Sequence, residues 1–242
     1  MGLGAGVQIS ASVPFDVRAV RIDYTNLDGD PYAPPYAEIH HRDETLAGPV
    51  DGRLLVRRFA RTSSGLVWGG GVGVSVPLGR TEADPYRLTA QGLVHQHLQM
   101  GSGTVDPLVT AFVWKSGEKW GVMAGLDGRA GLYANPKGYR PPTMAGLSVG
   151  PTYRASSAVT LIAGLELQGE TPEQWNGVDY GGRTSLIANA AATWSPSPTW
   201  TVQADVRTTA WQHDRGGADE SVRQALVGTG GVTFTPPRAD KE

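Results

Sequence analysis

Residues 120–132 read WGVMAGLDGRAGL, and their side chains alternate in polarity along the whole stretch. Every second residue from Trp120 to Leu132 is apolar or glycine, whereas the interleaved set contains Asp127 and Arg129. A period of two predicts a β-strand with two unlike faces. An apolar face opposite a face with charges is expected where a strand separates lipid from a polar lumen. The stretch therefore predicts a strand of a transmembrane β-barrel.

The same alternation recurs along the chain, for example in residues 7–15, 159–168, 184–194 and 200–211. We predict ten strands from it, at 3–15, 50–62, 65–79, 103–115, 118–134, 141–154, 157–169, 182–195, 199–212 and 221–235. Residues 16–26 also alternate, and they either extend the first strand or form a separate one. The expected fold is all-β, a single closed antiparallel up-and-down barrel spanning 1–235, with a short polar tail at 236–242.

The predicted connections alternate between short and long. The short ones, at 62–65, 115–118, 155–157 and 195–198, are rich in Ser, Gly and Pro, the residues that make tight turns. The long ones lie at 16–49, 80–102, 135–140, 170–181 and 213–220. Outer-membrane barrels have this wiring, with short periplasmic turns and long extracellular loops. An even strand number puts both termini of the chain on the periplasmic side.

Composition restricts the class of protein further. The chain has 242 residues and a net charge of −2, which gives no electrostatic reason to expect nucleic acid as a partner. No run of eighteen apolar residues occurs, which excludes a membrane helix. No secretory signal peptide is recognisable at the start. We therefore expect a mature form of an exported protein, and the untrimmed protein could have twelve strands.

Aromatic residues lie mostly at the predicted strand ends. Amphipathic rings settle at headgroup depth, so this distribution favours aromatic girdles at the two membrane interfaces. The residues concerned are Phe15, Trp68, Trp120, Tyr133, Tyr153, Trp194, Trp200 and Phe234.

Two segments carry a resemblance to a known family. Residues 69–80 read GGGVGVSVPLGR, and after a polar loop residues 96–107 read QHLQMGSGTVDP. In these motifs the chain resembles the transporter-like outer-membrane barrels of the meta-pathway phenol-degradation family. The resemblance implies a β-barrel in the outer membrane of a Gram-negative bacterium, with small hydrophobic or aromatic compounds as solutes. The chain departs from the family at its C-terminus, which does not end in an aromatic residue.

Charged residues on the minority faces are the main candidates for function. The strand phase points six of them into the lumen: Asp127, Arg129, Arg154, Glu166, Asp205 and Arg207. They could form a constriction that selects solutes by charge and size. Alternatively they form a structural ion-pair plug, because ten strands are closer to the filled eight-stranded barrels than to wide porins. The phase of the adjacent Arg57 and Arg58 is undecided.

Three glycines, Gly69, Gly71 and Gly73, lack side chains along one strand, and they suggest a lateral opening in the wall. The histidine pairs His40–His41 and His95–His97 lie in predicted loops and are interpreted as solvated, so no metal site and no cofactor is predicted. No nucleophile motif such as G-x-S-x-G occurs, and we do not predict an enzyme.

Three functions remain open at this point. The first is a channel for passive uptake of small compounds, with the lipid bilayer of the outer membrane as its environment. The second is a plugged barrel whose extracellular loops bind a partner. The third is a soluble antiparallel barrel, in which the apolar faces would point inward. The sequence gives neither the solute nor the oligomeric state.

Overall fold

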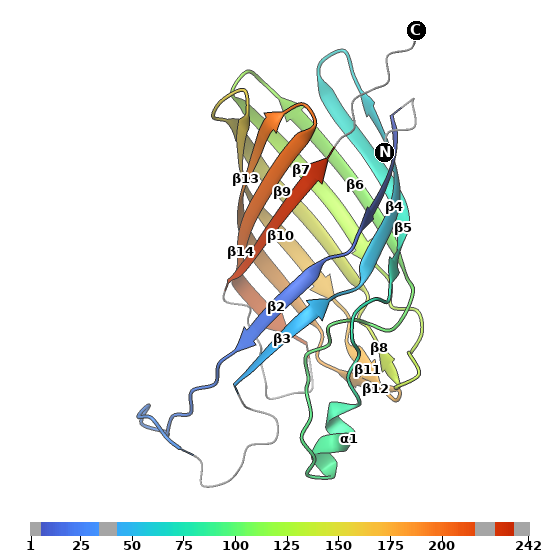
Figure 1. The fold of residues 1–242 in the computed structure, drawn as a ribbon, viewed down its shortest axis with the longest axis vertical. Helices are drawn as coiled ribbons and strands as arrows, with labels where there is room; N and C mark the ends of the chain where they lie inside the picture. The colour runs from blue at the N-terminus through green and yellow to red at the C-terminus, as the bar shows by residue number, and fades with distance from the viewer. Residues whose placement is uncertain (1–5, 34–42, 216–225, 235–242) are drawn as a thin grey trace.

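The predicted alternation forms one large antiparallel sheet in the computed structural model, which describes residues 6–33, 43–215 and 226–234. The sheet has ten strands and curls into a half-barrel (Figure 1). In spatial order the strands are β1 (Val7–Ser12), β4 (Gly52–Arg61), β5 (Leu66–Val76), β6 (Asp106–Ser116), β7 (Trp120–Arg129), β9 (Met144–Arg154), β10 (Val159–Glu170), β13 (Arg183–Ser197), β14 (Trp200–Asp214) and β15 (Val227–Phe234).

Each of the ten predicted ranges overlaps one strand of this sheet, so the predicted strands and their antiparallel up-and-down order are confirmed. Among the described residues, β1 and β15 are the two edges of the sheet and are not paired with each other. Closure of the barrel therefore stays a prediction. The polar tail at 236–242 lies outside the described residues.

The alternation of residues 16–26 corresponds to a separate strand, β2 (Phe15–Val20). It pairs with β3 (Glu44–Pro49), which lies inside the segment predicted as a long loop. The backbone N–H of Val50 donates to the carbonyl of Pro14 at 3.1 Å, so the β1–β4 ladder continues into β2–β3 across an irregularity. The prediction that all of 16–49 is a loop was wrong. The sequence of β3 has no marked alternation of its own, and the segment is a strand because it pairs with β2.

The connections lie as predicted, with short ones at one end of the sheet and long ones at the other (Figure 1). The long connections also contain elements that the sequence did not predict. These are α1 (Pro85–Ala90), β8 (Tyr139–Arg140), β11 (Glu173–Trp175) and β12 (Val178–Tyr180). We call residues 77–105, 130–143 and 171–182 together the cap.

The two faces of the sheet differ in polarity as the alternation predicts. Many large apolar side chains lie exposed on the convex face, including Ile9, Leu54, Val56, Val72, Val109, Val122, Leu126, Leu147, Val149, Leu161, Leu165, Leu167, Val206 and Val232. Their strand neighbours, among them Ser10, Asp127, Glu166 and Arg207, point to the concave face. Within the described residues, no helix is long and apolar enough to cross a membrane.

Replacing Gly73 by alanine should destabilise the sheet. A Cβ at this position would overlap the backbone oxygen of Leu54 and approach Leu55 Cδ2 to 2.8 Å. We expect Gly73→Ala to lower the free energy of unfolding by about 1–3 kcal/mol, the usual cost of overpacking. Gly231→Ala is the control, because no atom lies within 4 Å of its added Cβ. Urea unfolding followed by circular dichroism measures both, and equal midpoints would contradict the prediction.

Candidate functional site

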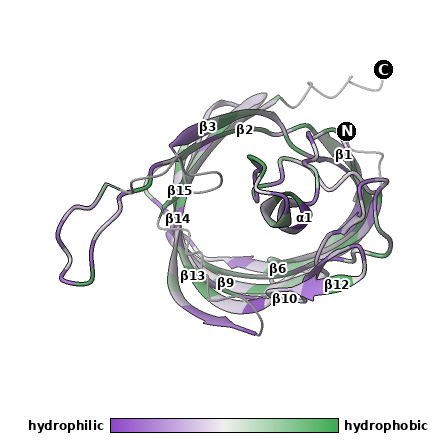
Figure 2. Cartoon of the chain, turned by 90° about the horizontal axis from the view of Figure 1, so that it is seen from below, coloured by the Kyte–Doolittle hydropathy of each residue, from purple (hydrophilic) through white to green (hydrophobic). Residues whose placement is uncertain are grey.

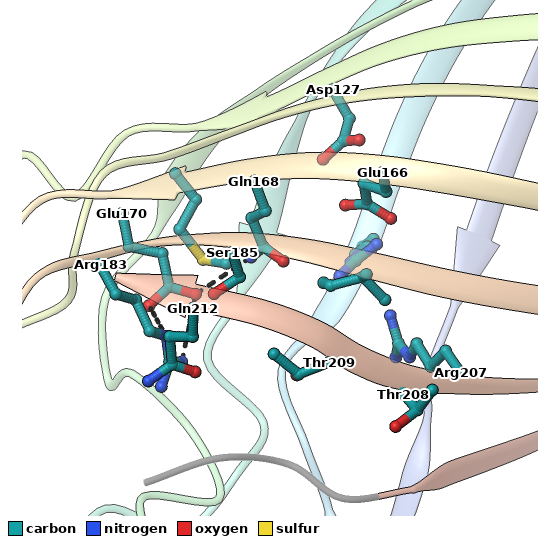
Figure 3. Close-up of a pocket in the computed structure, with 13 residues that line it drawn as sticks. Asp127, Glu166, Gln168, Glu170, Arg183, Ser185, Arg207, Thr208, Thr209 and Gln212 are labelled. Carbon is teal, nitrogen blue, oxygen red and sulfur yellow. Dashed lines mark hydrogen bonds and ion pairs between the residues drawn. The ribbon is translucent and has the colours of Figure 1, made fainter. Parts of the chain in front are cut away.

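The concave face of the sheet encloses a polar cavity of about 540 Å³ (Figure 3). Its lining comes from six strands, β4, β7, β9, β10, β13 and β14, and among the lining residues only Met144 and Ile187 are apolar. A second cavity of about 230 Å³ shares Glu166 and Arg207 with the first and adds Asp205 and Asn189. The lumen of the half-barrel is therefore a hydrophilic space rather than a packed apolar core.

Six charged side chains line the larger cavity. Four of them, from four different strands, have no ion-pair partner among the described residues, and we call them the lumen quartet: Arg53, Asp127, Glu166 and Arg207. Asp127 and Glu166 approach each other over Gly146 of the intervening strand β9. A Cβ at Gly146 would lie 2.9 Å from a carboxylate oxygen of each. Any larger residue there would push the two acids apart, so the glycine permits their proximity.

A different pair of charges closes the cavity toward the cap. Arg183 Nε lies 3.0 Å from Glu170 Oε2, and Gln168 donates to Glu170 Oε1 at 3.0 Å. Arg215 donates to the backbone oxygens of Glu170 and Arg183 at 3.1 and 3.2 Å. These side chains hold β10 against β13, so their charges serve the structure.

The six predicted lumen residues have four different environments. Asp127, Glu166 and Arg207 line the larger cavity, and Asp205 lines the smaller one. Arg129 lies 4.0 Å from the fully buried Asp106 of β6 and supports the start of that strand. Arg154 is exposed at the end of β9 near a short turn, and it lines neither cavity.

Ion pairing among these six residues is sparse. In the part of the chain that the structure describes, only Arg129 takes part in an ion pair, and its partner is Asp106. Asp127 and Arg129 share a face but do not pair with each other. The lumen charges therefore do not form a continuous ion-pair plug among the described residues.

The sequence did not single out Arg53, although it belongs to the quartet. It lies on the same face of β4 as Leu55 and Arg57, and the leucine hides the polar character of that face. Arg57 points to the concave side and donates to Ser10 Oγ at 3.3 Å. Arg58 is on the opposite face, beside Val7 and Gly70 near the end of the sheet with the short turns.

Gly69, Gly71 and Gly73 lie on β5 and pair with Phe59, Arg57 and Leu55 of β4. At each glycine the position of a Cβ is occupied by backbone and side-chain atoms of β4. The glycines thus allow β4 and β5 to pack closely. A lateral opening beside them stays a prediction that these contacts do not support.

The GSGTVDP motif at 101–107 organises the connection between β5 and β6. The Asp51 carboxylate accepts from the Ser102 backbone N–H at 2.7 Å and from its hydroxyl at 2.6 Å. Thr104 is fully buried and its hydroxyl donates to Asp106 Oδ1 at 2.8 Å. The backbone oxygen of Ser102 accepts from Asn135 Nδ2 at 2.9 Å, which links the motif to the next connection.

An aromatic core holds the cap together. Trp175 and Tyr139 are both buried, and their ring centroids lie 4.8 Å apart. Glu173 accepts from Tyr139 Oη at 3.2 Å and from Trp175 Nε1 at 3.3 Å. Burial raises the pKa of Glu173, and hydrogen bonds from Trp175 and Tyr139 oppose that shift. Burial and the nearby Glu173 carboxylate also raise the pKa of Tyr139, so its hydroxyl stays a donor.

The helix α1 is held near the mouth of the lumen. Viewed along the barrel from the cap end, α1 lies within the outline of the curled sheet (Figure 2). Asp84 caps its first turn and accepts from Asn176 Nδ2 at 2.7 Å. Tyr86 of α1 stacks on Tyr180 of β12 with ring centroids 3.6 Å apart. These contacts fix the helix to the β11–β12 hairpin.

His95 is buried against this helix, contrary to the expectation of a solvated loop histidine. Its Nδ1 lies 2.8 Å from the oxygen of Leu93, and its Nε2 lies 3.0 Å from the hydroxyl of Thr89. Both ring nitrogens are thereby engaged. Among the described residues, no group of three His, Cys, Asp or Glu could hold a metal ion. His40 and His41 lie outside the described residues.

Comparisons with models of protein families, with curated proteins and with solved structures gave no match to this chain. The resemblance to the phenol-degradation family therefore stays a prediction from the motifs at 69–80 and 96–107.

Replacing Trp175 by alanine should loosen the cap while the sheet stays folded. Removing a fully buried tryptophan costs about 3–5 kcal/mol, and the cost would fall on the small cap core. The backbone around the exposed Lys137 would then be free to enter a protease active site, so we expect faster tryptic cleavage after Lys137 with an unchanged β circular dichroism spectrum. Trp211→Ala is the control because Trp211 is half exposed on the sheet. Equal cleavage rates in the two variants would contradict the prediction.

Proposed function

We propose that this chain forms a closed β-barrel in a bacterial outer membrane and lets small solutes diffuse through its lumen. The observation that carries the proposal is the opposite polarity of the two faces of one curled sheet. The convex face exposes large aliphatic side chains from most of its strands, and the concave face surrounds a charged cavity. An arginine facing hydrocarbon at the bilayer midplane costs about 2–4 kcal/mol, so this distribution suits lipid outside and water inside.

Aromatic side chains on the convex face support a membrane boundary. Trp120 and Tyr153 lie 4.7 Å apart by ring centroids, and Trp200 and Phe234 lie 4.9 Å apart. Both pairs are at the end of the sheet with the short turns, where Trp194 also lies exposed. Such a row is typical of an interfacial girdle, since amphipathic rings prefer headgroup depth. A soluble barrel would need the apolar faces inward, and nothing in this arrangement favours it.

Closure follows from the cost of exposed backbone in a bilayer. The edge strands β1 and β15 carry unpaired N–H and C=O groups, each of which costs several kcal/mol in hydrocarbon. The two strands run in opposite directions, so an antiparallel ladder between them would complete the barrel. We therefore propose that β1 pairs with β15 in the membrane.

The lining of the cavity favours small hydrophilic solutes. It contains charged and amide side chains such as Gln168 and Gln212, together with the lumen quartet. Passage of hydrophobic or aromatic compounds rests on the family resemblance alone. The folded cap supports a second candidate function, a barrel that binds a partner through its loops, because its buried aromatic core makes it a defined surface.

Refolded protein should form discrete conductance steps in a planar lipid bilayer and migrate as a heat-modifiable band in detergent gels. Both follow from a closed barrel with a hydrated lumen. Heat-denatured protein in the same detergent is the control. A folded barrel without conductance would favour the partner-binding alternative, and a β-rich protein soluble without detergent would contradict both membrane functions.

The stagger of the strands predicts how β1 meets β15. When direct partners are followed from strand to strand, a row that begins at Val7 of β1 reaches β14 at Trp211. β15 pairs only with Trp200–Arg207, so the row meets β14 beyond the part that pairs with β15. Closing ten strands at a tilt of about 35–45° needs a total stagger of about ten to fourteen residues. The smallest of these staggers pairs all of β1 with residues 229–234 and puts Ile9 opposite Val232.

The double variant Ile9→Cys/Val232→Cys should therefore be joined by a short bifunctional thiol reagent in the folded, membrane-inserted protein. The chain contains no cysteine of its own, so the product is unambiguous. Ile9→Cys/Gly231→Cys is the matched control, because adjacent residues of a strand point to opposite faces. Gel mobility after cleavage in the 216–225 connection measures the link. An open edge would leave both variants unlinked.

A further inference from the structure

The lumen quartet differs from Arg129, Arg183 and Glu170 in having no close partner among the described residues. Within the described chain, neither a hydrogen bond nor an ion pair within 4 Å involves the side chains of Arg53, Asp127, Glu166 or Arg207. By contrast, Arg129 and Arg183 face Asp106 and Glu170 at 4.0 and 3.0 Å. The four unpaired groups reach a shared cavity of about 540 Å³ from four separate strands, so they face the space through which a solute would pass.

The signs within the quartet are separated in space. The two acids come from β7 and β10 in the middle of the sheet and meet over Gly146. The two arginines come from β4 and β14, which lie toward the opposite edges of the sheet. In the close-up, the carboxylates of Asp127 and Glu166 lie on one side, and Arg207 reaches toward them from β14 (Figure 3). Charge of one sign thus faces charge of the other across the cavity.

Opposite charges on facing walls create an electric field across the lumen rather than along it. Walls of low dielectric constant focus such a field, so it acts strongly on a solute inside. The quartet sums to zero charge, so it has no large preference for anions or cations. A molecule with an ammonium and a carboxylate group can satisfy both walls at once and recover part of its lost hydration.

We infer that the quartet is a selectivity filter for small zwitterions, which bind with the ammonium group at Asp127 and Glu166 and the carboxylate at Arg53 and Arg207. The inference rests on the proposed channel function and names its solute class. Neutral molecules of the same size gain nothing from the field. Singly charged molecules meet attraction from one wall and repulsion from the other.

Liposome swelling with two isomers tests the inference on the folded chain. Glycine is zwitterionic and glycolamide is neutral, and both have the same formula, so size does not distinguish them. We expect glycine to enter at least about twice as fast as glycolamide. The ratio should fall to about one in Asp127→Asn/Glu166→Gln and in Arg53→Gln/Arg207→Gln.

Reversal potentials in a KCl gradient provide the second measurement. Removing the two acids should make the pore anion-selective, and removing the two arginines should make it cation-selective. Glu118→Gln/Arg154→Gln is the matched control, since it removes one charge of each sign outside both cavities. This control should keep both the isomer ratio and the reversal potential of the unmodified protein.

The outcomes separate the inference from the proposed function. A pore that conducts but admits both isomers equally, with the same ion selectivity in all variants, would overturn the filter and leave the channel standing. Absence of any swelling or conductance from folded protein would overturn both. Loss of the glycine preference in the quartet variants alone, with opposite shifts in ion selectivity, supports the filter.

Discussion

The arrangement of this molecule depends on the strict period of two in its strands. Each residue of a strand points to the face opposite its neighbour, so one alternation decides two surfaces at once. Along β7, Val122 and Leu126 reach the convex face because Met123 and Asp127 reach the concave one. A register slip of one residue would bring Asp127 outward and Leu126 inward. The antiparallel partners on both sides fix the register of β7 through long uninterrupted ladders with β6 and β9.

Strand tilt explains how residues far apart in the sequence gather in one cavity. Direct partners of Asp127 are Thr110 on β6 and Gly146 on β9, neither of which is charged. Glu166 pairs with Ser148, two residues further along β9. Because the strands are tilted, residues that share a height in the barrel are displaced from the row of direct partners. The charged residues of the quartet are therefore neighbours through the curvature of the sheet and not through its hydrogen-bonded ladders.

The strands and the facing of Asp127, Glu166 and Arg207 were predictable from the sequence because periodicity is local. Arg53 was not, since Leu55 on the same face made the phase of β4 ambiguous. The cap escaped prediction for a different reason. Tyr139, Glu173 and Trp175 come from two connections, and their packing depends on contacts between segments that no local pattern records. His95 was likewise interpreted as solvated, although a helix of six residues buries it. The proposed pairing of β1 with β15 depends on the stagger of all nine ladders together, so no single stretch of sequence could indicate its register.

The contrast between paired and unpaired charges bears on whether the lumen is a plug or a passage. A buried charge without a partner loses its hydration and is costly, so natural cores pair their charges. Arg129 follows this rule beside the fully buried Asp106, and Glu170 follows it beside Arg183. Asp127 and Arg207, in contrast, are exposed to the cavity and have no such partner among the described residues. Water must supply their solvation, and such hydration is what the proposed passage of a solute requires. The inward charges therefore fall into two groups. Those near the cap form ion pairs that hold strands together, whereas those in the middle of the concave face have no ion-pair partner among the described residues.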